Sequence, residues 1–403
     1  MKPVLFISCM LASIFCSSQP ATPVNIFIIS TDGLRWQEVF RGAAEELLTD
    51  VRFVKDTALS REMFWEETLI ARRKKLMPFL WSVVEKGGQL HGNRDVKNKV
   101  NVSNLYKVSY PGYNEILTGY ADPSLMSNKP RNNPNDNLLE FLNNKPAYHN
   151  KVVAFSSWNV FPYILNEQRS GFPVNSGYNR MSEKDAAVNM INKVQDSVLT
   201  KEATRYDQLT FLQARQYLGQ FHPKVLMLSL GETDESAHQK QYDKYLQQAK
   251  NFDNMLAELW YMVQTDPFYK DNTLFVITTD HGRGSKPSKW YSHSMLVEGS
   301  SETWLALLGP GINPVGEMKS NTQIWQKQIA ATVAGLAGQN FEANHPVAAA
   351  FQLPVSVYTK QHEIATMSFP TLLLSSPGAL FILSLLLISM RIFLQKRNSH
   401  LQQ

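Results

Sequence analysis

Short runs of apolar residues recur along the chain, and their pattern limits the fold more than any other feature. Each run is apolar at consecutive positions, which is typical of strands that are buried on both faces of a sheet. The runs are residues 24–30, 151–157, 224–230, 273–279 and 303–309. Helical patterns lie between them, at residues 182–198 with a Ser-x-x-Asp start and at residues 243–263. This alternation predicts an α/β fold with a doubly wound, mostly parallel central sheet flanked by helices.

The region between the chain ends is long enough for one large domain. The chain has 403 residues, of which 43% are hydrophobic and 19% charged, and this allows a sizeable core. No internal repeat and no low-complexity linker divides residues 22–352. We therefore interpret these residues as a single domain with loop insertions.

The segment of residues 1–18 is typical of a secretory signal peptide. A lysine precedes an apolar run, and small residues follow the run. Both cysteines, Cys9 and Cys16, lie in this segment. The signal peptide places the mature chain outside the cytoplasm, where it would contain no disulfide. The lack of cysteines favours a bacterial envelope, such as the periplasm, over a eukaryotic secretory pathway.

An uncharged apolar segment near the other end predicts a single-pass membrane anchor. Residues 369–390 carry no charge and are followed by arginines and a lysine. At about 1.5 Å per residue, a helix of this length spans roughly the hydrocarbon core of a bilayer. The basic residues place a tail, residues 391–403, in the cytoplasm and the large domain outside, with a linker at residues 353–368 between domain and helix. A sorting tail that is removed after export is the alternative interpretation.

The net charge of +5 is modest and is spread along the chain. Its densest basic run, residues 71–75, leads directly into an apolar stretch, and no stripe of basic and aromatic residues accompanies it. We interpret the run as the solvated face of a helix, so no nucleic-acid partner is expected.

Carboxylates and imidazoles follow three of the predicted strands. Asp32 comes after the first strand, Asp234 and His238 after the third, and Asp280 and His281 after the fourth. Each would be ordinary alone, because such residues are common in turns and on surfaces. The carboxyl ends of parallel strands, however, meet at one edge of a sheet, where ligands bind. These are the ligand types of Zn²⁺ and similar divalent ions, and together they exceed one tetrahedral site, so two metal ions are expected.

A serine-containing motif adds a resemblance to a known family. Residues 109–119, SYPGYNEILTG, are similar in length and pattern to the nucleophile motif T-F-P-N-x-Y-x-x-x-T-G of type I phosphodiesterases. The chain departs from that motif at Gly112, where the family has asparagine. The motif order over most of residues 25–341 resembles the alkaline phosphatase superfamily, particularly its phosphodiesterase/nucleotide pyrophosphatase and cofactor-independent phosphoglycerate mutase branches. The resemblance implies an alkaline phosphatase-like catalytic domain over residues 22–352.

The resemblance also implies a role for each candidate residue. Ser109 would be the nucleophile. One metal ion would be bound by Asp32, Ser109, Asp280 and His281, and the other by Asp234, His238 and a third histidine. Two histidines are candidates for that last position, His293 and His345. We predict His293, because it lies close in sequence to a ligand pair and precedes another predicted strand.

Asparagines beyond the nucleophile are expected to contact the substrate. In the family, an asparagine further along the chain often stabilises the charge of the transition state. The candidates in this chain, which we leave unranked, are Asn128, Asn132 and Asn133.

These features predict a metal-dependent phosphoester hydrolase, a phosphodiesterase or phosphatase, of the cell envelope. Two divalent metal ions, with Zn²⁺ as the expected metal, would activate Ser109 for attack on phosphorus, and water would then hydrolyse the phosphoserine. The expected substrate is a small molecule or a lipid-linked or glycan-linked phosphoester. The chain would contact the membrane through its C-terminal helix.

Three alternatives share the fold. A sulfatase would carry arginine at the fifth position of its Cys/Ser-x-Pro-x-Arg motif, where this chain has Tyr113. A mutase-like relative would need a large inserted domain, for which the stretch between Ser109 and Asp234 leaves little room. A non-catalytic, membrane-anchored binding protein would be expected to have lost part of the nucleophile and ligand set, which is complete here.

Overall fold

The computed structural model describes residues 24–182 and 186–354. The predicted signal peptide, transmembrane helix and cytoplasmic tail, and nearly all of the linker, lie outside these residues. Within the described ranges, no helix combines the length and the apolar character that a membrane crossing requires.

An eight-stranded sheet with the strand order β10-β2-β9-β7-β1-β6-β4-β5 forms the centre of the domain. Its strands are β1 (Asn25–Thr31), β2 (Gly88–His91), β4 (Val152–Ser156), β5 (Val174–Ser176), β6 (Val225–Leu230), β7 (Thr273–Thr278), β9 (Leu305–Leu308) and β10 (Gly316–Glu317). All neighbours pair in parallel except β9, which runs antiparallel to both β7 and β2. The prediction of an α/β fold with a mostly parallel sheet is confirmed. Each predicted apolar run overlaps one of these strands, and β1 extends one residue past its run, to Thr31.

The antiparallel course of β9 follows from its connection to β7. Parallel neighbours need a crossover, usually an α-helix, whereas antiparallel neighbours do not. Between β7 and β9 the chain forms only the 3₁₀ helix η3 (Pro287–Lys289) and the short strand β8 (Glu302–Thr303). The long loop therefore stays at the edge of the sheet where β7 ends. β8 itself joins β3 (Lys99–Asn101) and β11 (Gln323–Trp325) in a separate small sheet with the order β11-β3-β8.

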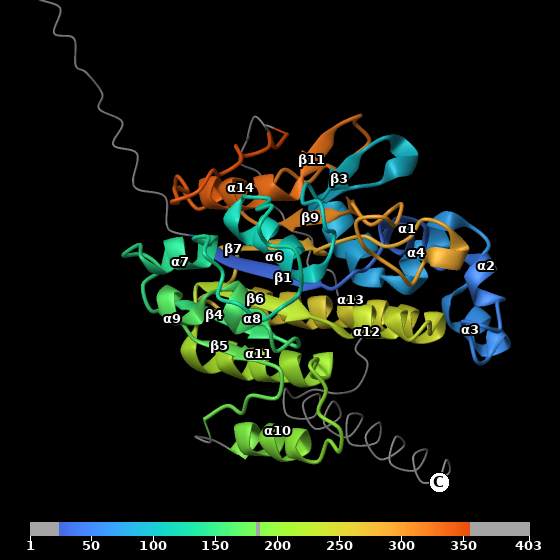
Figure 1. Ribbon diagram of the computed structural model, residues 1–403, viewed down its shortest axis with the longest axis horizontal. Helices are drawn as coiled ribbons and strands as arrows, with labels where there is room; N and C mark the ends of the chain where they lie inside the picture. The colour runs from blue at the N-terminus through green and yellow to red at the C-terminus, as the bar shows by residue number, and fades with distance from the viewer. Residues whose placement is uncertain (1–23, 183–185, 355–403) are drawn as a thin grey trace, which may run out of the picture.

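Helices cover both faces of the sheet (Figure 1). They are α1 (Trp36–Arg41), α2 (Glu45–Leu48), α3 (Thr57–Phe64), α4 (Leu69–Leu76), α5 (Glu85–Gly87), α6 (Ser109–Thr118), α7 (Leu138–Asn143), α8 (Phe161–Ile164), α9 (Glu167–Ser170), α10 (Ala186–Asp196), α11 (Asp207–Phe221), α12 (Glu232–His238), α13 (Tyr242–Thr265) and α14 (Ile329–Leu336), with the π-helix η1 (Leu80–Val84) and the 3₁₀ helices η2 (Arg94–Val96) and η4 (Gln326–Gln328). The helical pattern at residues 243–263 lies within α13, and the pattern at residues 182–198 contains α10.

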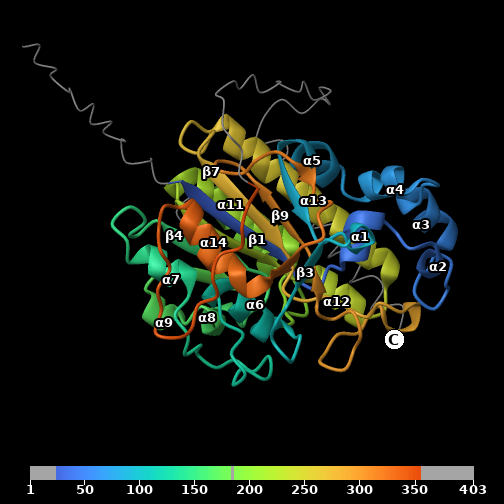
Figure 2. The same cartoon turned by 90° about the horizontal axis from the view of Figure 1, so that it is seen from above.

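Two apolar cores lie on opposite faces of the sheet, because alternate residues of a strand point to opposite faces. In β1, Phe27 and Ile29 pack in one core with α11 and α13, whereas Ile26 and Ile28 pack in the other with α6, α7, α8 and α14. Figure 2 shows α7 and α8 on one side of the sheet and α13 on the other. The sheet is thus buried on both faces, as its apolar strands predict.

Three neighbouring strands end at the same level. The register aligns Thr31 with Leu230 across β1 and β6, and Ser30 with Thr278 across β1 and β7. The loops that leave these strands therefore begin side by side. The candidate ligands that follow the three strands are brought to one edge of the sheet by this register.

Candidate active site

The candidate residues after β1 and β7 gather around Ser109, the first residue of α6. Ser109 Oγ lies 3.5 Å from Asp32 Oδ1 and 3.4 Å from His281 Nε2. His281 Nε2 in turn lies 3.4 Å from Asp32 Oδ1 and 3.5 Å from Asp280 Oδ2. Asp32, Asp280 and His281 each place one possible ligand atom within 4.8 Å of the others. These four buried residues form the first group of the site.

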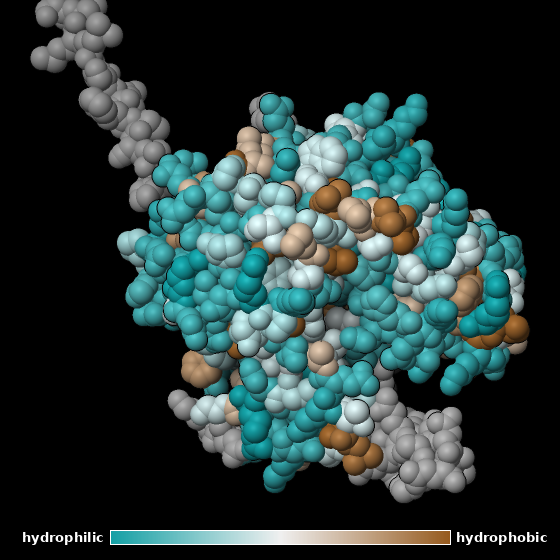
Figure 3. Space-filling model, in the orientation of Figure 1, coloured by the Kyte–Doolittle hydropathy of each residue, from teal (hydrophilic) through white to brown (hydrophobic). Residues whose placement is uncertain are grey.

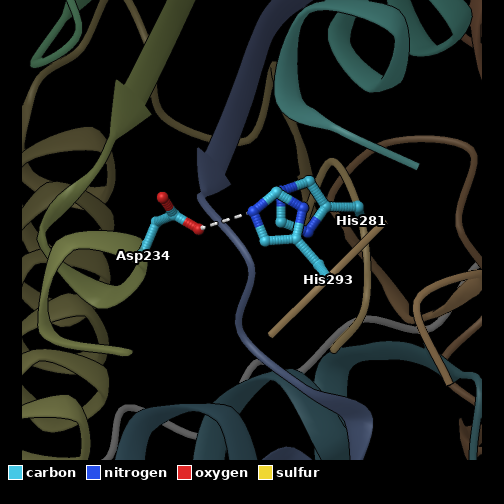
Figure 4. Close-up of side chains that lie close together, drawn as sticks. All are labelled: Asp234, His281 and His293. Atoms are coloured by element: carbon cyan, nitrogen blue, oxygen red, sulfur yellow. Dashed lines mark ion pairs between the residues drawn. The ribbon is translucent and has the colours of Figure 1, made fainter. Parts of the chain in front are cut away.

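The second group consists of Asp234, His238 and His293. On α12, Asp234 Oδ2 lies 3.1 Å from His238 Nε2. His293 comes from the long loop after β7, and its Nε2 lies 3.1 Å from His238 Nε2 and 3.8 Å from Asp234 Oδ1. Figure 4 shows Asp234 facing His293 and His281, whose rings stack 3.9 Å apart at an interplanar angle of 10°. The two groups therefore touch and form one continuous site.

Backbone carbonyls orient the two stacked imidazoles. Nδ1 of His281 donates to the oxygen of Gly282 at 3.0 Å, and Nδ1 of His293 donates to the oxygen of Lys107 at 3.1 Å. In this tautomer each Nε2 directs its lone pair toward the centre of the site, as in metal-ligating histidines. A lone pair that faces carboxylate oxygens is repelled unless a proton or a cation lies between them. The donor set and its orientation therefore fit the predicted metal ions.

The pKa values of the first group also favour a bound cation. Burial raises the pKa of Asp32 to about 8, with Asp280 adding to the shift, and burial raises the pKa of Asp280 to about 7. Burial also lowers the pKa of His281 and of His293. Asp280 Oδ2 is buried with no hydrogen-bond donor among the described residues. A divalent cation would supply that partner and favour the ionised carboxylates.

Tyr113 also belongs to the site, although the sequence motif did not indicate a role for it. Its hydroxyl donates to Asp32 Oδ2 at 3.5 Å and accepts from Ser229 Oγ at 3.0 Å. Burial keeps the pKa of Tyr113 well above its ordinary value, so the phenol remains a neutral donor. The signal for this role is its spacing of four residues from Ser109, which places both side chains on one face of α6.

The structure explains why Gly112 departs from the family motif. A Cβ atom at this position would lie 2.4 Å from the main-chain oxygen of Asp280, so the backbone of α6 packs directly against the Asp280 loop. We expect Gly112→Ala to lower the free energy of unfolding by about 1–3 kcal/mol and to move Ser109 away from Asp280, with loss of activity. Urea unfolding measures the first effect. Gly335→Ala in α14 is the matched control, because nothing lies within 4 Å of its Cβ position. Equal losses of stability in the two variants would contradict the explanation.

The candidate asparagines Asn128 and Asn132 lie in different places. Asn128 Oδ1 accepts a hydrogen bond of 2.9 Å from the main-chain nitrogen of Tyr110, so Asn128 supports the first turn of the helix that begins at Ser109. Asn132 is exposed and lines a separate cavity of about 550 Å³. Asn128 is thus bonded to α6, whereas Asn132 is exposed at a cavity.

The structure places Asn133 and His345 outside the two groups. Asn133 is fully buried, and its amide donates to Asn114 Oδ1 at 3.0 Å and to the oxygen of Ile164 at 3.1 Å. His345 lies outside both groups: Nε2 donates to the oxygen of Asp136 at 2.8 Å. His293, not His345, accompanies Asp234 and His238.

A model of the type I phosphodiesterase/nucleotide pyrophosphatase family matches residues 65–352. The matched range includes Ser109 and all the histidines of the site, whereas Asp32 precedes it and joins the site through β1. No curated protein sequence matches the chain at a significant level.

Solved structures of low sequence identity share the fold. Alkaline phosphatase PafA matches as a mutant with a TM-score of 0.55 at 13% identity and as the wild type with 0.53 at 11%, and each match covers 82% of this chain and 99% of PafA. The lipoteichoic acid synthase LtaP from Listeria monocytogenes matches with a TM-score of 0.50 at 12% identity, over 79% of this chain and 73% of LtaP. The fold is thus that of the alkaline phosphatases. The chain belongs to the type I phosphodiesterase/nucleotide pyrophosphatase family of the alkaline phosphatase superfamily and is a hydrolase that acts on phosphoester bonds.

Proposed function

We propose that this chain hydrolyses phosphoesters with Ser109 as the nucleophile and two divalent metal ions, Zn²⁺ in preference, as cofactors. The observation that carries the proposal is the position of the Ser109 hydroxyl, which lies 3.5 Å from Asp32 Oδ1 and 3.4 Å from His281 Nε2. A serine hydroxyl is a weak nucleophile until a neighbouring group or a metal ion activates it. Ser109 has such neighbours and lies at the N-terminus of α6, where partial positive charge favours an anion.

The two groups of the site would hold one metal ion each. Asp32, Asp280 and His281 would bind the first together with Ser109, and Asp234, His238 and His293 would bind the second. When bound, such ions lower the pKa of a coordinated hydroxyl and neutralise the charge of a phosphoryl group in the transition state. Imidazole nitrogens in both groups favour Zn²⁺ over Mg²⁺, which prefers oxygen ligands.

The proposed hydrolysis has two steps, and in both of them residues of the chain position the reacting groups and accept protons. The Ser109 hydroxyl donates toward Asp32 Oδ1, so its oxygen lone pairs are free to attack phosphorus. As the bond from Ser109 Oγ to phosphorus forms, the hydroxyl proton passes to Asp32 Oδ1, the bond to the leaving group breaks, and the departing alkoxide takes a proton from solvent. Water then attacks phosphorus and gives up a proton to solvent, the bond from phosphorus to Ser109 Oγ breaks, and Oγ takes back the proton from Asp32. The product is phosphate, or a phosphomonoester if the substrate is a diester. The hydroxyl of Tyr113 holds the second oxygen of Asp32 throughout.

The cavity lined by Asn132 is separate from the two groups, and we propose that it receives the part of the substrate that extends beyond the phosphoester. Its wall includes Tyr163, whose main-chain oxygen accepts a hydrogen bond of 3.2 Å from the hydroxyl of Tyr110, the residue next to Ser109. Amides, carboxylates and an amine line the rest of it, including Glu167 and Lys201. Such groups bind hydroxyls well. We therefore favour a small polar or glycan-linked phosphoester over a lipid-linked one.

The site of action that we propose is the extracytoplasmic side of a bacterial membrane. Support for it comes from the sequence of the two chain ends, with a signal-peptide pattern at residues 1–18 and an uncharged apolar segment at residues 369–390.

A comparison of three chromogenic substrates tests the proposal. We expect hydrolysis of p-nitrophenyl phosphate or bis-p-nitrophenyl phosphate and much slower hydrolysis of p-nitrophenyl sulfate, because Tyr113 replaces the arginine of the sulfatase motif. The ratio of the two phosphate rates distinguishes a monoesterase from a diesterase. Faster cleavage of the sulfate than of either phosphate would favour the sulfatase alternative. Inactivity on all three substrates, with no bound metal, would remove the catalytic proposal.

A further inference from the structure

Arg283 is a buried cation inside the site, and none of the sequence motifs predicts a role for it. It follows Asp280, His281 and Gly282 directly, and its side chain has no exposed surface. A buried guanidinium is costly unless polar partners surround it. Nε donates to the oxygen of Gly33 at 3.1 Å, Nη1 donates to the oxygen of Tyr291 at 2.6 Å, and Nη2 contacts Asp234 Oδ1.

These partners belong to the segments that carry the candidate metal ligands. Gly33 follows Asp32, and Tyr291 lies two residues before His293. Asp234 is itself a candidate ligand, and Arg283 lies two residues after His281. We propose that Arg283 is a positioning residue that orients the Asp234 carboxylate and holds the ligand-bearing loops of both groups in register. This inference rests on the proposed two-metal function.

The backbone at Gly33 is shaped around this arginine. Gly33 has a φ of +61°, and a Cβ atom there would lie 2.7 Å from Arg283 Nε and 2.9 Å from Nη2. A side chain at this position would displace the guanidinium and would also strain the backbone. The turn after Asp32 therefore leaves space for the arginine, which is an observation independent of the hydrogen bonds.

The geometry of the carboxylate explains why the residue is an arginine. Asp234 Oδ2 faces His238, whereas Oδ1 faces both Arg283 and His293. The planar guanidinium has donors in fixed directions, so it can fix the rotation of the carboxylate while it also bonds two backbone oxygens. Lysine has the charge but lacks this fork. Outer contacts of this kind commonly change metal affinity when they are removed.

Arg205 provides the matched control, because it is another fully buried arginine. It donates to Thr210 Oγ1 at 3.0 Å and to Asn175 Oδ1 at 2.9 Å, and it contacts none of the candidate ligands. Loss of either arginine should destabilise the fold, but only loss of Arg283 should change metal binding.

The test measures metal binding by the full-length chain and its variants Arg283→Met, Arg283→Lys and Arg205→Met. Zn²⁺ affinity is obtained by competition with a chromophoric chelator, and the ligand field of each site from the absorption spectrum of the Co²⁺ form. We expect Arg283→Met to lower the affinity for one of the two bound Zn²⁺ ions by about 10–100-fold and to alter the absorption spectrum of the Co²⁺ form. Arg283→Lys should give a similar loss, because charge alone does not orient the carboxylate. Arg205→Met should lower the melting temperature without either change.

Each outcome decides the inference. If Arg283→Met does not fold, the lysine variant provides the comparison, and wild-type affinity and spectrum in that variant overturn the positioning role. Equal weakening by Arg205→Met also overturns it, because the effect would then come from general destabilisation. If the wild-type chain binds no Zn²⁺ or Co²⁺, the two-metal function fails, and the positioning role that rests on it fails as well.

Discussion

Ser109→Ala is expected to lower kcat on the best phosphoester substrate by roughly 10⁴-fold or more, the scale on which removal of a nucleophile acts. The methyl group cannot form the bond to phosphorus that the Ser109 hydroxyl forms. The carboxylates and imidazoles of both groups remain, so the variant should still bind two metal ions. Steady-state kinetics together with metal analysis of the same protein sample checks both statements.

Two variants serve as controls for this result. Ser109→Thr should keep substantial activity, because the family motif that residues 109–119 resemble carries threonine at the nucleophile position. Ser170→Ala removes another buried serine, which is remote in sequence from the residues of the site. The hydroxyl of Ser170 accepts a hydrogen bond of 3.2 Å from Asn137 Nδ2. The substitution should cost about 1 kcal/mol of stability and leave kcat unchanged. A Ser109→Ala variant as active as the wild type would mean that another group attacks phosphorus.

Removal of metal by a chelator is expected to lower kcat by roughly 10²–10³-fold or more. Loss of a single electrostatic stabiliser of the transition state has an effect of this size. Added Zn²⁺ should restore activity, whereas Mg²⁺ should not, because three imidazoles belong to the two groups. Metal analysis before and after chelation is the check. Full activity in protein shown to be free of metal, or full recovery with Mg²⁺ alone, would contradict this expectation.

The pH dependence of metal binding follows from the two buried carboxyl groups. The native pKa values of Asp32, about 8, and Asp280, about 7, lie above the ordinary value of 3.8 in the metal-free protein. Their protonated forms therefore stabilise the metal-free fold below pH 3.8, and this contribution is lost as the pH rises through both native pKa values. Metal ions bind the ionised forms, so protons compete with them at low pH. Zn²⁺ should accordingly raise the melting temperature more at pH 8 than at pH 5, which differential scanning calorimetry can measure.

Local patterns of sequence predicted five of the eight strands of the central sheet, because β1, β4, β6, β7 and β9 each contain an apolar run, whereas the short strands β2, β5 and β10 do not. Four consecutive apolar residues, 26–29, lie at the centre of the predicted run 24–30, and β1 occupies nearly the same range, Asn25–Thr31. The predicted alternation of strands and helices also placed the candidate site at the carboxyl ends of the parallel strands. The antiparallel direction of β9 was not predictable in this way, since it depends on the absence of an α-helix in a connection rather than on the strand itself.

The candidate ligands were predictable only in part. Asp32, Asp234 and Asp280 follow strands directly, so their convergence follows from the topology. The choice of His293 over His345 depends on how a long loop returns to the edge, which no local pattern specifies. The burial of Asn133 was not predictable either. The sequence places it in a polar loop as a candidate for substrate contact, whereas the folded chain buries it completely.

By itself, the sequence determined the sheet, its carboxyl edge and the residue types that meet there, since these depend on local hydrophobic patterns and on which residues follow each strand. Only the tertiary structure decided how those residues are held. The packing of Gly112 on the backbone of Asp280, the bond from Tyr113 to Asp32 and the bridge from Arg283 to Gly33 and Asp234 each join segments remote in sequence. Such contacts depend on distances of a few ångströms between separate elements, and no pattern within one element encodes them.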